Sequence, residues 1–184
     1  MKALDRGEQV MLLRKGGIRE EGKDFRVIHP EFLLYPTFEH QKDELLQEKY
    51  HQDLQQVLSE AQGGDTITFS HWAGVEEVIE LTEQDKLDNL SPYHIWSDDY
   101  AQKRLHWKPR SPLSVMLLRL YRLEEPQTVP YLPSYSGCKS WVELSEDVPL
   151  GHLTPVLAED DFRSKVGEVK AALGLSPSYK FEGA

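Results

Sequence analysis

The feature that most constrains the fold is the run LSVMLLRLYRL at residues 113–123. Successive side chains of a strand point to opposite faces of its sheet. In this run both sets are apolar, with Leu113, Val115, Leu117 and Tyr121 on one face and Met116, Leu118 and Leu120 on the other. A strand that is apolar on both faces is covered on both faces. We therefore expect a central strand here, with other elements packed against each side.

Weaker signals on either side of this run mix strands with helices. Strand patterns are found at residues 9–14, 25–28, 31–35 and 138–144, and residues 66–81 are interpreted as two strands with a bend near Ala73-Gly74. Helical spacing is found at residues 43–62 and 158–173, capping signals at Thr82 and Ser97, and a proline-rich loop is expected around Pro126, Pro130 and Pro133. Strands outnumber the long helices and do not alternate with them. This predicts an α+β fold: a small mixed, mostly antiparallel β-barrel or strongly bent sheet decorated with helices.

Length and composition limit the class of protein. A chain of 184 residues fits one domain, and we expect residues 1–175 to form it and residues 176–184 to be a loose tail. No run of ~18 apolar residues is present, so no membrane partner is expected. Charged residues near the start argue against a secretory leader, and a single cysteine, Cys138, excludes an internal disulfide and a multi-cysteine zinc site. The expected location is the cytoplasm.

Charge is unevenly distributed along the chain, whose formal net charge is −10. Residues 43–99 hold 2 basic and 14 acidic side chains, whereas residues 100–142 hold 7 basic and 2 acidic ones. The overall sign opposes non-specific binding to polyanions. The basic segment predicts a local basic face, unless its cations only offset the acidic segment elsewhere in the fold.

The first candidate site lies in residues 14–41, around two short strands and their turns. Strand ends and loops are where binding and catalytic groups usually lie. Arg14 and Lys15 flank Gly16-Gly17, whose backbone N–H groups suit an anion. The predicted ligand- or phosphate-binding side chains are Arg14, Lys15, Tyr35, Thr37 and Gln41, and the candidate catalytic residues are His29, His40 and Glu31. The alternative is a hairpin turn with solvated charges.

The second candidate site combines aromatic and basic residues. Trp72 and Trp107 are predicted to stack on bases, with Arg104 and Arg119 on phosphate. The alternative is that these tryptophans pack in the core or at its rim. His29-Pro30-Glu31 has the H-x-E spacing of zinc deaminases, but one cysteine cannot complete their site. No metal and no other cofactor is predicted.

Two resemblances follow from particular stretches. The stretches LLRKGGIREE at 12–21, HPEFLLYPTFEHQ at 29–41, HIWSDDY at 94–100 and GCKSWVEL at 137–144 resemble a bacterial family of unknown function that is common in cyanobacteria. Residues 67–126 are similar to the PUA-like group, especially its EVE-type domains. The second resemblance implies a small barrel that binds RNA or a flipped, modified base in an aromatic-lined pocket.

These observations favour a nucleic-acid or nucleotide-binding module with an aromatic and basic pocket. One alternative is an enzyme that processes phosphoesters or nucleotides, with its site in residues 14–41. Another is an acidic protein-interaction module whose surface is the helix expected at 43–62. The sequence does not decide whether the chain is an enzyme, and it names no protein partner.

Overall fold

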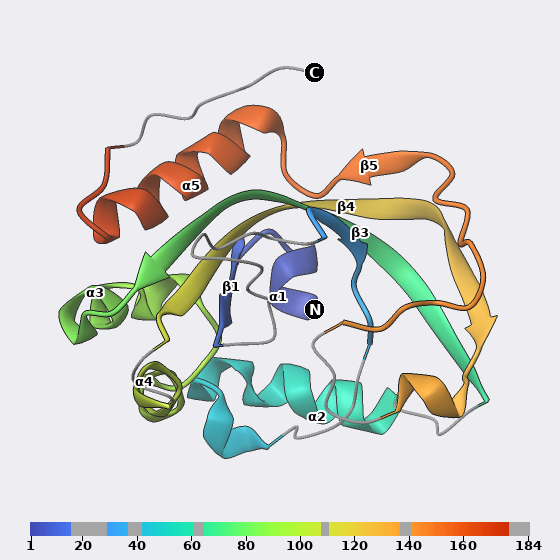
Figure 1. The fold of residues 1–184 in the computed structure, drawn as a ribbon, viewed down its shortest axis with the longest axis horizontal. Helices are drawn as coiled ribbons and strands as arrows, with labels where there is room; N and C mark the ends of the chain where they lie inside the picture. The colour runs from blue at the N-terminus through green and yellow to red at the C-terminus, as the bar shows by residue number, and fades with distance from the viewer. Residues whose placement is uncertain (16–28, 37–41, 61–64, 108–110, 137–140, 177–184) are drawn as a thin grey trace.

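The computed structural model describes residues 1–15, 29–36, 42–60, 65–107, 111–136 and 141–176 (Figure 1). The strands are β1 (Met11–Arg14), β2 (Glu31–Leu33), β3 (Thr66–Leu81), β4 (Leu113–Pro130) and β5 (Leu153–Pro155). The α-helices are α1 (Lys2–Asp5), α2 (His51–Glu60), α3 (Gln84–Asn89), α4 (Asp98–His106) and α5 (Glu159–Ala172). Short 3₁₀ turns lie at η1 (Asp43–Leu45), η2 (Glu48–Tyr50), η3 (Ser91–Tyr93) and η4 (Pro133–Tyr135).

The described strands form one antiparallel five-stranded sheet. Its path is β1-β4-β3-β2, and β5 pairs with β4 beyond the reach of β1. The α+β class and the antiparallel sheet are therefore as expected. Of the two forms expected, a β-barrel or a strongly bent sheet, the described strands form the open, bent sheet, because β1 and β2 lie on opposite edges of the β3–β4 ribbon and do not pair.

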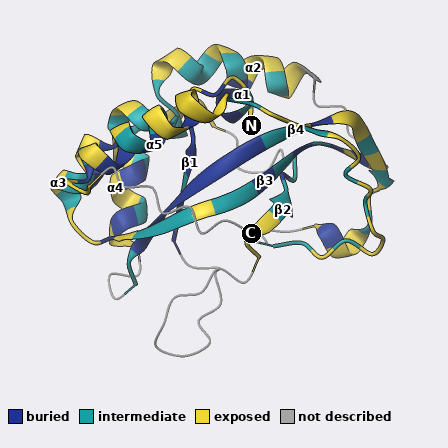
Figure 2. Cartoon of the chain, turned by 90° about the horizontal axis from the view of Figure 1, so that it is seen from above, coloured by how far each residue is buried: buried dark blue, intermediate teal, exposed yellow. Residues whose placement is uncertain are grey.

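The central strand predicted from residues 113–123 is confirmed. β4 pairs with β1, β3 and β5, and every residue from Leu113 to Leu120 is buried. Figure 2 shows this stretch as a continuous dark blue band. The strand also runs on to Pro130, where a loop was expected. Pro126 is tolerated because it falls in a register shift, where β4 has no paired residue on β3, and Pro130 is the last residue of the strand.

β3 is one strand, so the expected division near Ala73-Gly74 is wrong. The long strand bends without breaking because its pairing with β4 shifts register twice, between Phe69 and His71 and between Val75 and Glu77. Extra residues in one strand of a pair bend and twist it locally. The bend is therefore absorbed by bulges rather than by a turn.

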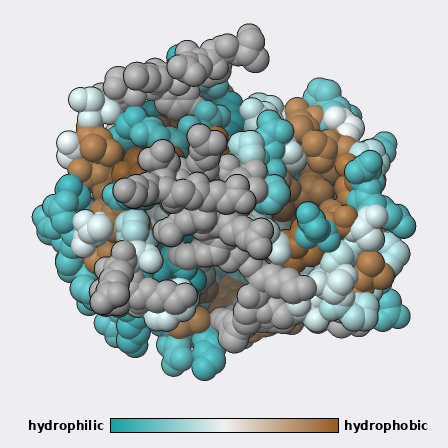
Figure 3. Space-filling model, viewed as in Figure 1, coloured by the Kyte–Doolittle hydropathy of each residue, from teal (hydrophilic) through white to brown (hydrophobic). Residues whose placement is uncertain are grey.

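Helices cover both faces of the β3–β4 ribbon (Figure 1). On one face α5 buries Phe162, Val166 and Val169 against the odd-numbered apolar residues of β4, as its spacing predicted. On the other face α1 packs Leu4 against the even-numbered ones. An ion pair joins α1 to α2, with 2.5 Å between Arg6 Nη2 and Asp53 Oδ2. In Figure 3 apolar surface gathers over the half of the ribbon that lies away from α3 and α4.

Four further expectations need correction or lie outside the described residues. The helix expected at 43–62 begins only at His51, because Leu46 forms a β-bridge with Trp96 and residues 46–47 are extended. Residues 141–144 form no strand, and residues 25–28 and 138–140 are not described. Most of the expected tail, 177–184, is not described either.

Candidate functional site

The sequence preceding α4 determines how the helix begins. The side chain of Ser97 caps the helix by accepting a hydrogen bond from the Tyr100 N–H at 3.4 Å, as its position predicted. The chain before the cap is anchored by Gln47, whose side-chain amide donates to the carbonyls of Ser91, His94 and Trp96. These bonds fix the direction of α4 relative to the 42–51 segment.

Four residues at helical spacing form a ladder along α4, which we call the α4 stripe: Trp96, Tyr100, Arg104 and Trp107. The rings of Trp96 and Tyr100 lie 4.7 Å apart between centroids. The Arg104 guanidinium lies 5.7 Å from the Tyr100 ring and 5.5 Å from the Trp107 ring. Tyr100 and Arg104 are four residues apart on α4, where such residues are neighbours, and Trp96 and Trp107 flank the two ends of the helix. The α4 stripe is therefore a set of aromatic faces with a cation between them.

The first two predicted residues of the 14–41 segment join this stripe. Burial lowers the pKa of Arg14, at the end of β1, and the positive charge of Arg104 lowers it further, so Arg14 lies within electrostatic range of Arg104. Lys15 is buried and donates a hydrogen bond from Nζ to the Leu105 carbonyl of α4. Arg14 and Arg104 thus form one positive region, whereas Lys15 is used to hold α4 against β1.

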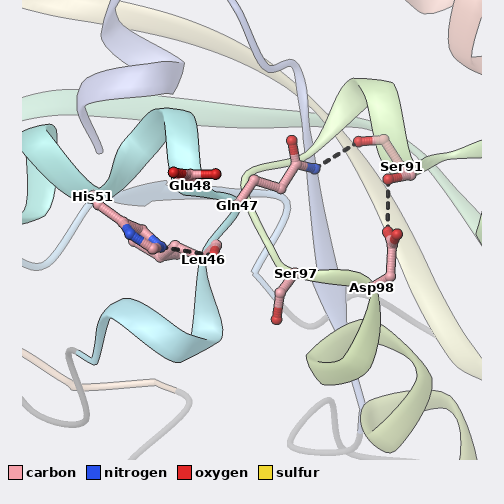
Figure 4. A pocket seen from close by; sticks show the side chains of 7 residues that line it. All are labelled: Leu46, Gln47, Glu48, His51, Ser91, Ser97 and Asp98. Carbon is pink, nitrogen blue, oxygen red and sulfur yellow. Dashed lines mark hydrogen bonds between the residues drawn. The ribbon is translucent and has the colours of Figure 1, made fainter.

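A cleft opens at the N-terminal end of α4 (Figure 4). Its volume is about 570 Å³, and it is lined by Leu46, Gln47, Glu48, His51, Ser91, Ser97 and Asp98. Ser91 donates to Asp98 at 2.7 Å, and His51 Nε2 lies 3.1 Å from the Leu46 carbonyl. The carboxylates of Glu48 and Asp98 make this end of the helix acidic.

His94 lies behind this cleft and is only 2% exposed. Neither ring nitrogen has a hydrogen-bond partner among the described residues. Burial lowers the pKa of His94, although the charge of Asp98 acts in the opposite direction. His94 is therefore neutral near pH 7 and adds no positive charge to the cleft.

The other predicted residues near β2 lie elsewhere. His29 stacks edge-on against Trp141 with 5.1 Å between ring centroids, and Tyr35 against Phe69 with 6.0 Å. Glu31 is exposed at the start of β2. Thr37, His40 and Gln41 lie outside the described residues. Of the predicted residues in 14–41, Arg14 and Lys15 therefore lie near α4, whereas His29 lies beside Trp141.

Two residues predicted to act together with Trp107 and Arg104 are distant from them or buried. Trp72 packs edge-on against Tyr121, nine residues before the end of β3, or about 30 Å of extended strand away from the turn into α3. Arg119 is only 7% exposed; it pairs with Glu159 at 3.3 Å and lies 4.5 Å from the Phe162 ring centroid. Trp72 thus packs within the β3–β4 ribbon and Arg119 contacts α5, while their expected roles in base stacking and phosphate binding stay predictions.

Sequence reasoning missed a hydrogen-bonded chain at the middle of the sheet. Ser70 Oγ lies 2.8 Å from His71 Nδ1, and His71 Nε2 lies 2.8 Å from Asp5 Oδ1. Arg122 Nε donates to the same Asp5 oxygen at 2.6 Å. Adjacent strand residues normally point to opposite faces. No motif in the sequence signals this contact, because it depends on the register shift at Ser70 and on distant residues of α1 and β4.

The described residues hold neither a cluster of metal ligands nor a membrane-spanning helix. No three His, Cys, Asp or Glu side chains in these ranges gather as metal ligands would. None of the helices in the same ranges is long and apolar enough to cross a bilayer.

Comparison with known proteins gives one match. The family model described as Domain of unknown function (DUF1802) matches residues 1–168. The chain belongs to this family. No curated protein and no solved structure matches. The expected membership of a family of unknown function is confirmed, whereas the similarity of residues 67–126 to PUA-like domains stays a prediction.

Proposed function

We propose that the chain binds single-stranded nucleic acid or nucleotides along the α4 stripe. The observation that carries this proposal is the packing of Arg104 between Tyr100 and Trp107, with Arg14 alongside. Trp107 is 47% exposed, which is unusual for the largest apolar side chain. A solvent-facing ring beside two guanidinium groups suits a base on the ring and a phosphate on the arginines.

The charge of the chain limits how much of a strand it would bind. A net charge of −10 disfavours a long polyanion. Two cations at the site imply about two phosphate contacts, so the logarithm of the affinity should fall with log salt with a slope of about −1.4 for a single strand. Binding therefore depends mainly on stacking, and a short single strand or nucleotide is favoured over a duplex.

Fluorescence anisotropy with short labelled DNA and RNA tests this proposal. Stacking contributes about 1–3 kcal/mol per base. Trp107→Ala should therefore weaken binding about 5- to 150-fold. Tyr131→Ala removes a similarly exposed ring, 40% exposed, at the far end of the ribbon and should leave the affinity unchanged.

A second pair of matched variants tests how much the charge of Arg104 contributes to binding. Arg104→Ala should weaken binding and make the salt slope shallower by about 0.7. Arg163→Ala on α5 removes the same charge from a surface pair with Glu159 and should change neither. If wild type binds no strand or nucleotide at low salt, or if Trp107→Ala and Tyr131→Ala behave alike, the proposal is wrong.

The two alternative functions remain predictions that no observation favours. Of the proposed catalytic residues, His29 and Glu31 lie apart from the α4 stripe, and His40 is not described. That the acidic surface at 42–60 binds a protein partner stays a hypothesis.

A further inference from the structure

Three side chains lie in a row at the register shift in the middle of the β3–β4 ribbon. They are the hydroxyl of Ser70, the imidazole of His71 and the carboxylate of Asp5. Phe69 pairs with Gln127, but His71 pairs with Arg122, so β4 contains extra residues opposite Ser70. Bulges of this kind re-aim side chains and are frequent beside active sites. Here the side chains of Ser70 and His71 are in contact, although consecutive side chains of a strand normally point to opposite faces.

The Asp5 carboxylate determines which ring nitrogen of His71 donates a hydrogen bond to it. Burial works against ionisation of Asp5, but hydrogen bonds from His71 and Arg122 outweigh it and lower its pKa. An ionised carboxylate only accepts hydrogen bonds, so His71 Nε2 must donate to it. In the neutral ring Nδ1 then carries a lone pair, which faces the Ser70 hydroxyl at 2.8 Å. Ser70 therefore donates its proton to a base that is held in the correct tautomer.

We propose that Ser70 is the nucleophile of a hydrolytic site for carboxylic esters, with His71 as its base. This arrangement of hydroxyl, imidazole and carboxylate activates serine in unrelated folds. Ser70 is half-buried, so part of this residue is open to solvent, while His71 is buried. Asp5 is a positioning residue that acts through His71, and Arg122 is a positioning residue that holds Asp5.

The reaction needs only the ester and water. As Ser70 Oγ bonds to the acyl carbon, its proton moves to His71 Nδ1. The bond from the acyl carbon to the alcohol oxygen breaks, and that oxygen takes the proton from His71. Water then attacks the acyl carbon and gives a proton to His71. The bond to Oγ breaks, Ser70 regains the proton, and the carboxylic acid leaves.

A fluorophosphonate probe tests the nucleophile in the full chain. Its phosphorus would bond to Ser70 Oγ with loss of fluoride, and peptide mass spectrometry would locate the adduct. We expect one adduct, on Ser70, and none in Ser70→Ala. Thr68→Ala is the matched control, because Thr68 is an exposed hydroxyl two residues away that bonds to Thr128 at 2.9 Å. It should label like wild type.

The labelling rate and the kcat of ester hydrolysis test the roles of His71 and Asp5. A general base contributes about 10²–10⁴-fold, so His71→Asn should slow labelling at least about 100-fold. With p-nitrophenyl acetate, Asp5→Asn should lower kcat with little change in KM, which a purely structural role would not produce. Urea midpoints verify that each variant is folded. Trp107→Ala should label normally, which separates this site from the α4 stripe.

Three results would overturn the proposal. The first is a folded wild type that acquires no adduct. The second is an adduct on another residue that persists in Ser70→Ala. The third is a labelling rate that His71→Asn leaves unchanged. The wild-type result alone decides the matter if the variants do not fold.

Discussion

Asp5 is expected to stabilise the fold, because its side chain joins α1 to β3 and β4. The carboxylate accepts from His71 Nε2 at 2.8 Å and from Arg122 Nε at 2.6 Å. The His71 side chain is 11% exposed, so that bond is assigned about 1.5 kcal/mol, the lower end for bonds to charged groups. The Arg122 side chain is 46% exposed, so that pair is assigned about 0.5 kcal/mol. Asp5→Ala should therefore lower the free energy of unfolding by about 2 kcal/mol.

The pH dependence of this effect has a definite sign. The folded pKa of Asp5 lies below its unfolded value of 3.8. The stabilisation is therefore fully present above the unfolded value and is lost as pH falls through the folded one. The difference between wild type and Asp5→Ala should be constant from pH 7 to about 5 and should shrink towards pH 3.

Urea unfolding followed by circular dichroism measures both quantities. Asp5→Asn keeps one acceptor oxygen and should cost about half as much as Asp5→Ala. A loss below about 0.5 kcal/mol at pH 7, or a difference that grows on acidification, would refute this account of Asp5.

Three further predictions concern packing and burial. Gly7→Ala should cost about 2–4 kcal/mol in urea unfolding, because Gly7 has a φ of +67° and a Cβ there would lie 2.5 Å from Leu157; a cost under about 1 kcal/mol would contradict this. Phe162→Ala should cost about 3–5 kcal/mol, since the ring fills the α5 interface and covers Arg119, and an unchanged urea midpoint would show that α5 is not docked as described. His94 has a folded pKa below its unfolded value of 6.5, so stability should fall as pH drops below 6.5, and His94→Gln should reduce that fall; equal pH profiles for the two proteins would contradict the burial of a neutral ring.

The sequence predicted those elements whose signals are local. Leu113–Leu120 of β4 and the apolar face of α5 could be assigned because each shows a strong periodicity. The Ser97 cap could be assigned because capping depends on a few adjacent residues. Local patterns of this kind survive folding when tertiary contacts agree with them.

The errors arose where distant contacts override local preference. Leu46 has helical spacing but bridges to Trp96, which delays α2. Pro126 predicts a loop, but a register shift accommodates it inside β4. Neither contact can be derived from nearby residues, because each depends on how strands and loops far apart in sequence come together.

The candidate site was predicted in part for the same reason. Arg104 and Trp107 were both taken from the basic, aromatic 100–142 segment, and they are in contact. Trp72 was expected to stack on a base together with Trp107, and it packs against Tyr121. The contact of Ser70 with His71 has no sequence signal, since it requires a bulge.

The measurement that tests the central claim most directly is an NMR titration of the tryptophan indole N–H signals with a short single-stranded oligonucleotide. The chain has 4 tryptophans, so each signal can be assigned by single replacement with phenylalanine. Binding along the α4 stripe predicts that the Trp107 signal shifts most and Trp96 next, while Trp72 and Trp141 stay in place. Shifts confined to Trp72 and Trp141, or no shift at any indole, would contradict the account.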